Sequence, residues 1–348
     1  MGSPILPRSI ADPTGQDPRE RRAMADFKSR LRNIQRGMLR ILDDQSYTVV
    51  AVNEASVNPH WPILQRLADE EYQRNLESLR ESTGDNGIAY ELAANTRIAV
   101  NRYYAANATV YRFELDETIL DRINAEIGLL IDAILLQGGQ RNLWFLESYV
   151  RPAYQQGTAQ SAANLTVQSA EYALARPTLE TVLLSEPYQR RIGMLRARVF
   201  EEMQGLTAYM KTDLSRTLSQ GMSLGKNPRV IAKDIRARIG VSQSRANTIA
   251  RTEVSAALKN ARLDEDADAR DRLGIQMKQM QLSALSPTTR PEHAARHAHL
   301  YTEQEVREWR ARDANDINCK CGFVAVLVDD DGNPLTPAIV ERAKKMRR

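Results

Sequence analysis

The chain has 348 residues, which is enough for two or three domains. Hydrophobic residues make up 42% of it and aromatic residues only 6%, so a substantial core can form and a chain disordered throughout is excluded. This balance favours long packed helices. We therefore predict a mainly α fold with long helices, few short strands and a small C-terminal α+β unit. Because the first residues contain no apolar run typical of a signal peptide, we expect a soluble, intracellular protein.

The net charge of +4 is concentrated at the two ends of the chain. Residues 1–42 carry nine basic and four acidic side chains, and residues 341–348 carry five and one, so the body between them is mildly acidic. This pattern suggests tethers to DNA or to an acidic partner, although tails that only keep the protein in solution would look the same. The candidate contacts are Arg30, Arg32, Arg36, Arg40, Lys344, Lys345, Arg347 and Arg348.

Four prolines within residues 1–20 predict a flexible basic arm over 1–22. Residues 23–185 are predicted to form a mostly helical domain with a few short strands. Its first helix has apolar residues at helical spacing from Phe27 to Ile41 and a basic opposite face, which we interpret as solvated rather than as a dedicated DNA or membrane surface.

Two runs rich in β-branched and aromatic residues, 47–52 and 109–115, predict strands that pair across intervening helices over 62–80 and 88–105. Further helices are expected over 117–136 and 141–175.

A long helix is predicted over 186–225, because apolar residues recur every three or four positions from Tyr188 to Leu218 and Gly221, Gly225 and Pro228 follow. Residues 226–330 are predicted to form an α+β domain, and 331–348 a basic tail.

Within the predicted α+β domain, strands are expected over 275–285 and 321–328. Thr302 and Glu305 form a capping-box pattern that opens a short helix.

The sequence contains no phosphate-binding glycine loop, no Gly-x-Ser-x-Gly turn and no His-Glu-x-x-His pair. Their absence favours a structural protein over an enzyme. With only two cysteines the chain is not a disulfide scaffold, and a reducing compartment fits.

Three of the four histidines and both cysteines fall between His293 and Cys321. A helix opened by Pro291 would place His293 and His297 on one face, and an extended segment would point Cys319 and Cys321 the same way. Two imidazoles and two thiolates are typical ligands of a structural zinc ion. The predicted ligand set is His293, His297, Cys319 and Cys321, with His299 as the replacement. The alternative is surface histidines beside two inert thiols.

The order of several short motifs resembles the family of phage Mu F-like minor head proteins, also called the phage head morphogenesis family. The motifs are the run Ile249-Ala250-Arg251-Thr252-Glu253, the run Thr289-Arg290-Pro291-Glu292-His293 and the pair Cys319-Lys320-Cys321. The resemblance covers roughly residues 206–328, and the residues that match it in a structural role are Arg245, Arg251, Thr252, Glu253 and Arg290.

The chain departs from the family at two places. The predicted strand 275–285 lacks the usual tryptophan, and Asp316-Ile317-Asn318 stands where the family often has His-Pro. The second imidazole of the family pattern is therefore missing from its usual place, and His297 and His299 are the candidates to substitute for it.

The resemblance implies a non-enzymatic minor capsid protein of a tailed phage that acts in procapsid assembly and DNA packaging. It implies that the protein binds the portal protein inside the procapsid and contacts scaffold or major capsid protein. It also implies non-specific contact with packaged double-stranded DNA, and makes the protein a candidate for ejection with that DNA. The expected location is the virion, inside the head, and the host cytoplasm during assembly, with no membrane in the assembled head.

Two other classes of function remain open. A metal-dependent hydrolase, nuclease or phage-delivered effector would use His293, His297 and a cysteine-bound ion, with Glu292 as base; a closed four-ligand site argues against it, because catalytic zinc needs an open position. A DNA-binding regulator is disfavoured, because the sequence has no helix-turn-helix signature and its body is acidic.

Overall fold

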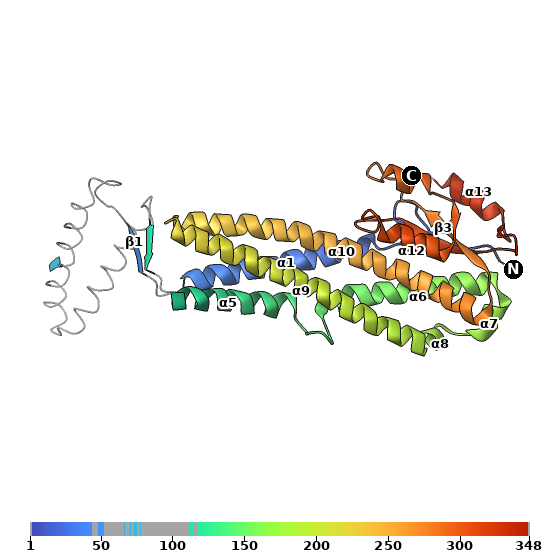
Figure 1. Ribbon diagram of the computed structural model, residues 1–348, viewed down its shortest axis with the longest axis horizontal. Coiled ribbons are helices and arrows are strands. Elements are labelled where there is room, and N and C mark those ends of the chain that lie inside the picture. Colours follow the sequence, from blue (N-terminus) through green and yellow to red (C-terminus); the bar gives the residue numbers. More distant parts are fainter. Residues whose placement is uncertain are drawn as a thin grey trace. The chain divides into compact units, whose positions relative to one another are not determined.

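The computed structural model describes residues 2–43, 48–51, 111–114 and 117–346, with single positions between 66 and 77 (Figure 1). The helices predicted over 62–80 and 88–105 lie largely outside the described residues, as do Arg347 and Arg348. The chain divides into two compact units whose segments interleave along the sequence. The first unit comprises Met1–Leu31, Ala133–Thr207 and Ser242–Arg348, and the second comprises Arg32–Asp132 and Ala208–Val241.

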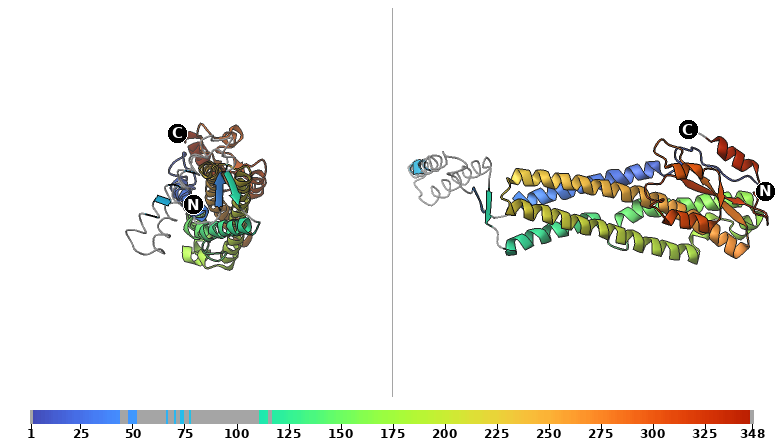
Figure 2. Two further views of the ribbon diagram at one scale, coloured as in Figure 1. Left: turned by 90° about the vertical axis from the view of Figure 1, so that its left-hand side faces the viewer. Right: turned by 45° about the horizontal axis from the view of Figure 1, so that its top comes forward.

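In the part of the second unit that the structure describes, four helical segments lie side by side as a bundle (Figure 1, Figure 2). They come from α1 (Asp17–Asp43), α5 (Glu117–Leu135), α9 (Glu186–Ser223) and α10 (Pro228–Leu273). Each has apolar residues at helical spacing, so each presents a stripe to the others. The buried side chains are Ile34, Met38, Ile123, Ile127, Ile131, Met210, Leu214, Leu218, Met222, Ile231, Ile235 and Ile239.

Two short strands also belong to the second unit. β1 (Thr48–Ala51) and β2 (Tyr111–Glu114) pair antiparallel, with Thr48 opposite Glu114 and Ala51 opposite Tyr111. The predicted pairing of 47–52 with 109–115 is thereby confirmed.

The predicted long helix is confirmed as α9, and its nine apolar positions from Tyr188 to Leu218 are all buried. The chain leaves this helix at Gly225, whose φ of +60° lies in the left-handed region that glycine tolerates. Among the residues that the structure describes, no helix combines the length and the apolar character that a membrane span requires.

In the first unit, the second half of α10 packs on α6 (Arg151–Gln168). Their backbones approach closely at Gly157, where an added Cβ would lie 2.4 Å from the Leu258 carbonyl oxygen. The predicted helix 141–175 is not continuous. It comprises η1 (Leu146–Val150), α6 and α7 (Ala170–Ala175), because Ser169 is extended and caps α7 by accepting a hydrogen bond from the Tyr172 amide. α8 (Leu179–Leu183) follows.

The predicted C-terminal α+β unit contains a three-stranded antiparallel sheet in the order β4-β3-β5. β3 (Met277–Leu282) is central. It pairs with β5 (Gly322–Leu327) over its whole length and with β4 (Leu300–Tyr301) through its middle residues Gln279 and Met280. α11 (Pro291–Ala295) and α12 (Glu303–Ala311) connect the strands. Thr302 and Glu305 form the predicted capping box at the start of α12.

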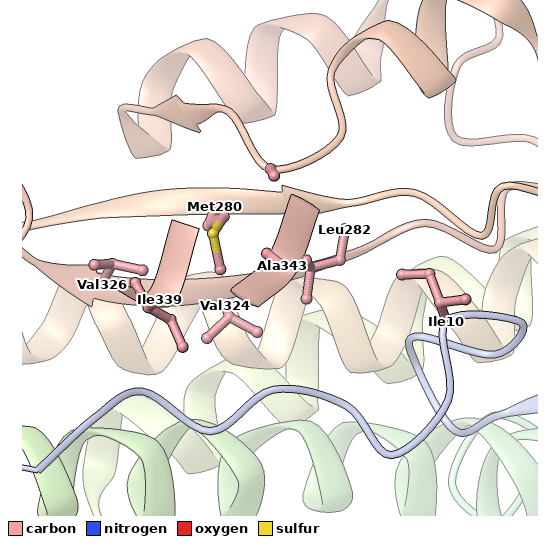
Figure 3. Close-up of a cluster of buried hydrophobic side chains, with 8 residues drawn as sticks. Ile10, Met280, Leu282, Val324, Val326, Ile339 and Ala343 are labelled. Carbon is pink, nitrogen blue, oxygen red and sulfur yellow. The ribbon is translucent and has the colours of Figure 1, made fainter. Parts of the chain in front are cut away.

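Both chain ends pack on this sheet (Figure 3). Ile10 comes from the N-terminal segment and Ile339 and Ala343 from α13 (Ala338–Lys345), and they share a buried cluster with strand residues. The prediction of a flexible arm over 1–22 is wrong in this respect, since α1 already begins at Asp17. The 331–348 segment likewise contains a packed helix. A small sheet has too few apolar side chains for a core of its own, and these ends supply the missing ones. The strand members are Met280, Leu282, Val324 and Val326.

Candidate metal centre

Three soft ligand atoms converge at the end of the sheet. The Nδ1 atom of His293 lies 3.5 Å from the Cys319 sulfur and 3.6 Å from the Cys321 sulfur, and all three side chains are buried. His293 is placed by α11, which begins at Pro291 as predicted, and the cysteines directly precede β5. We call His293, Cys319 and Cys321 the metal cluster. Imidazole and thiolate groups are the ligands that zinc prefers, so the residues fit this ion.

The His293 ring is held with one nitrogen toward the thiols. Its Nε2 atom lies 3.2 Å from Asn315 Oδ1. The side-chain Nδ2 of the same Asn315 donates to the Trp309 carbonyl oxygen at 2.9 Å. This second bond makes Oδ1 the acceptor, so Nε2 carries the proton and Nδ1 presents a lone pair to the cluster. Trp309 also packs edge-on to the imidazole, with ring centroids 4.5 Å apart. An outer partner of this kind typically orients a ligating histidine.

The two buried thiols differ in their tendency to ionise. The pKa of Cys319 is lowered, first because the Cys321 thiol donates a hydrogen bond to its sulfur, and also because the Lys259 ammonium is close; burial acts in the opposite direction. The pKa of Cys321 is raised, because its thiol donates that bond, is buried and faces a thiolate. A bound dication would replace the remaining proton, because metal ligation requires both sulfurs as thiolates.

The loop before Cys319 contains three residues other than glycine in the left-handed region. Asp313, Ala314 and Asn318 have φ values of 51°, 54° and 53°, and at Ala314 this conformation costs about 1–2 kcal/mol relative to glycine. Arg290 offsets this cost. Its guanidinium donates to the carbonyl oxygens of Ala314, Asn315 and Ile317. Arg290, part of the Thr289–His293 motif, therefore stabilises the loop that leads to Cys319.

The other motif holds the same loop from α10. The Thr252 hydroxyl oxygen accepts a hydrogen bond from the backbone N–H of Asn318 at 3.2 Å. One turn on, the Ser255 hydroxyl donates to the Cys319 carbonyl oxygen at 2.9 Å. Glu253 lies on another side of α10 and forms an ion pair with Arg198 of α9 at 2.7 Å. Arg245 is exposed on α10.

A buried ion network that sequence reasoning missed supports Cys319. Lys259, whose side chain is 1% exposed, pairs with Asp316 and donates to the Cys319 carbonyl oxygen at 3.3 Å. Arg310 pairs with the same carboxylate at 2.6 Å. Burial raises the pKa of Asp316, but the attraction and hydrogen bonds of the two cations outweigh it and hold the pKa well below its usual range. A lysine among apolar residues of α10, between Leu258 and Ala261, was the signal in the sequence.

The predicted ligand His297 is not in the metal cluster. α11 ends at Ala295 and Ala298 adopts a φ of 60°, so His297 does not follow His293 on one helical face. Its Nδ1 accepts from the Ser283 amide at 3.1 Å, and its Nε2 donates to the Ala343 carbonyl oxygen at 3.0 Å. His299, the expected replacement, is exposed. Within the described ranges the cluster thus has three ligands rather than four.

The candidate DNA contacts fall into two groups. Arg30 is structural, because its guanidinium lies 3.8 Å from the Trp144 ring centroid and donates to the Ile134 carbonyl oxygen at 2.7 Å. The side chains that remain exposed are Arg32, Arg36 and Arg40 on α1, and Lys344 and Lys345 on α13.

A comparison with family models agrees with the resemblance seen in the sequence. Residues 212–324 match the family described as Phage Mu protein F like protein. No curated protein and no solved structure matches the chain. The matched range runs from α9 through α10 into β5 and includes Thr252 and Arg290. Residues 212–324 are thus similar to the Phage Mu F-like family, and they contain all three residues of the metal cluster.

Proposed function

We propose that this chain is a minor capsid protein of a tailed phage, that it acts in head morphogenesis, and that it is not an enzyme. The observation that carries the proposal is the match of residues 212–324 to the Mu F-like family, which points to phage heads and hence to the virion. The helical bundle and the small sheet offer assembly surfaces of the kind such a role needs.

We place its action at the portal vertex, inside the procapsid. Co-expressed with the portal protein from the same phage, the chain should co-purify with it. Procapsids assembled without portal should lack the chain. Normal incorporation into portal-less shells would contradict portal binding and would favour the scaffold or the major capsid protein as its partner.

The metal cluster has a structural role in this proposal. An ion bound by His293, Cys319 and Cys321 would join α11 to the start of β5 and close the connection that contains α12. Because the sheet is small, metal binding would add directly to the free energy of folding. Zinc fits the ligand types.

Contact with packaged DNA would use the exposed arginines Arg32, Arg36 and Arg40 of α1. Deleting residues 1–22 would remove Ile10 from the core, so charge reversal is the better test. The triple Arg→Glu variant should lose most of its affinity for duplex DNA, and the wild-type affinity should fall steeply with salt and be independent of sequence. Unchanged affinity in that variant would assign these side chains to solubility alone.

A metal-dependent hydrolase or nuclease is the second candidate, and one observation favours it: the metal cluster has three ligands and lines a cavity. Its proposed base Glu292 is exposed. Incubation of the zinc-loaded protein with plasmid DNA should give no nicking beyond that of Cys319→Ser. Cleavage that the variant loses would favour the enzyme.

A further inference from the structure

The metal cluster lines a cavity of about 630 Å³. The start of α1 contributes Asp17, Glu20 and Arg21 to its wall, and α10 contributes Arg251. The loop between β3 and α11 contributes Ser286, Thr288 and Thr289. All of these residues belong to the first unit.

Two of the cations on this wall are already engaged. Lys320 forms an ion pair with Asp17 at 2.7 Å, and Arg290 is bonded to the loop carbonyl oxygens. Arg21 and Arg251, by contrast, are exposed and form no hydrogen bond or ion pair with another residue in the part of the chain that the structure describes. Two guanidinium groups without an anion therefore border the cavity beside the metal cluster.

An ion held by the metal cluster would have room for one ligand from outside the chain. Structural zinc sites almost always have four ligands, and His293, Cys319 and Cys321 would supply three of them. No further His, Cys, Asp or Glu of the described residues has its ligand atom within the cluster. His297 is used elsewhere.

We propose that the metal centre is open toward this cavity and that its fourth position takes an oxygen of a small oxyanion, such as a carboxylate or sulfate group, whose other oxygens pair with Arg251 and Arg21. A dication with two thiolates is neutral, so the two guanidinium groups make the surroundings favourable for a negative charge. This inference rests on the metal centre proposed above.

Glu20 opposes the anion. Its side chain is 4% exposed, and burial, followed by the nearby Asp17, raises its pKa to about 7. Asp12 acts in the same direction, and Lys320 and Lys259 act against it. At pH 8 the carboxyl group is mostly ionised and repels an anion in the cavity. Replacing it by a neutral amide should therefore tighten anion binding.

The test uses the full chain loaded with Co²⁺, whose visible absorption bands report the coordination of the ion. Titration with sulfate, and separately with acetate, at pH 8 should change these bands with a saturating curve in the millimolar range expected for a small anion. Arg251→Gln should weaken the affinity about tenfold, because it removes a charge-assisted hydrogen bond. Glu20→Gln should strengthen it several-fold. Arg236→Gln, an exposed position of α10 that does not line the cavity, should leave it unchanged.

The outcomes separate the two proposals. A chain that binds Co²⁺ but shows no spectral change with either anion overturns the open position and leaves the metal centre standing. A spectral response that is equal in wild type and Arg251→Gln overturns the role of the guanidinium groups. A chain that binds no Co²⁺ overturns both the metal centre and the anion site.

Discussion

His293 and Asn315 form the contact that orients the metal cluster, with Nε2 and Oδ1 3.2 Å apart. Asn315 is itself fixed by its bond to the Trp309 carbonyl oxygen at the end of α12. The helix that follows the capping box thus determines which imidazole nitrogen faces the thiols.

Asn315→Ala should lower the zinc affinity about 10–100-fold, the usual effect of removing an outer partner of a ligating histidine. Competition with a chromophoric chelator measures it. Asn333→Ala, at an exposed position in the turn after β5, is the control and should bind zinc as the wild type does. Equal affinities for the two variants would mean that the ring needs no support from Asn315.

Arg290→Met should destabilise the first unit by about 2 kcal/mol, because three carbonyl oxygens of a strained loop lose a charged donor. Urea unfolding gives the change. Arg312→Met removes an exposed arginine next to the same loop and should cost little. If both variants unfold at the wild-type urea concentration, the loop keeps its conformation without Arg290.

Gly157→Ala tests the close approach of α6 and α10. An added Cβ would lie 2.4 Å from the Leu258 carbonyl oxygen and 2.8 Å from the Ala261 Cβ, so the helices must separate. We expect a loss of about 1–3 kcal/mol in the free energy of unfolding. Gly193→Ala is matched to it, since Gly193 lies in α9 with nothing within 4 Å of the new atom. It should stabilise the protein by up to about 1 kcal/mol, and a loss of similar size at both positions would contradict the packing.

Asp266 should make stability depend on pH. The pKa of its fully buried carboxyl group is raised to about 7 by burial, against hydrogen bonds from Ser161 and Gln279. Because this pKa exceeds that of the unfolded chain, near 3.8, the folded state binds the proton more tightly. The contribution of Asp266 to the free energy of unfolding is therefore greatest below about pH 4, decreases up to about pH 7 and is constant above it.

The measurement for Asp266 is a series of urea titrations from pH 4 to pH 8 on the wild type and Asp266→Asn. The difference between the two free energies of unfolding should shift against the wild type as the pH rises through this window. A constant difference would show that the carboxyl group keeps an ordinary pKa in the folded state.

Local patterns predicted the local structure. The helix α9, the capping box at Thr302, the first turn at Pro291 and the strands β3 and β5 all follow from residues within a few positions of one another. The convergence of His293 with both cysteines was also predicted, since helix and strand geometry give the direction of each side chain.

What the sequence did not reveal depends on distant contacts. His297 was expected to continue α11, but the chain reverses at Ala298 so that its backbone can bond to Gln281 in β3. The two basic ends were expected to be unpacked, because their charges and prolines can be read directly from the sequence. The packing of Ile10 and Ile339 on a distant sheet cannot be read from it. Nothing in the sequence distinguishes Asn315 from other loop residues; only the fold places its Oδ1 atom next to His293 Nε2.

Native mass spectrometry of the purified chain, with Cys319→Ser and His297→Ala beside it, tests the metal centre most directly. The account predicts one zinc ion per wild-type chain, none in Cys319→Ser, and one in His297→Ala, because His297 bonds to Ser283 and Ala343 instead of the cluster. A wild-type chain without metal after purification in zinc-containing buffer, or a His297→Ala chain that loses it, would contradict the three-ligand centre.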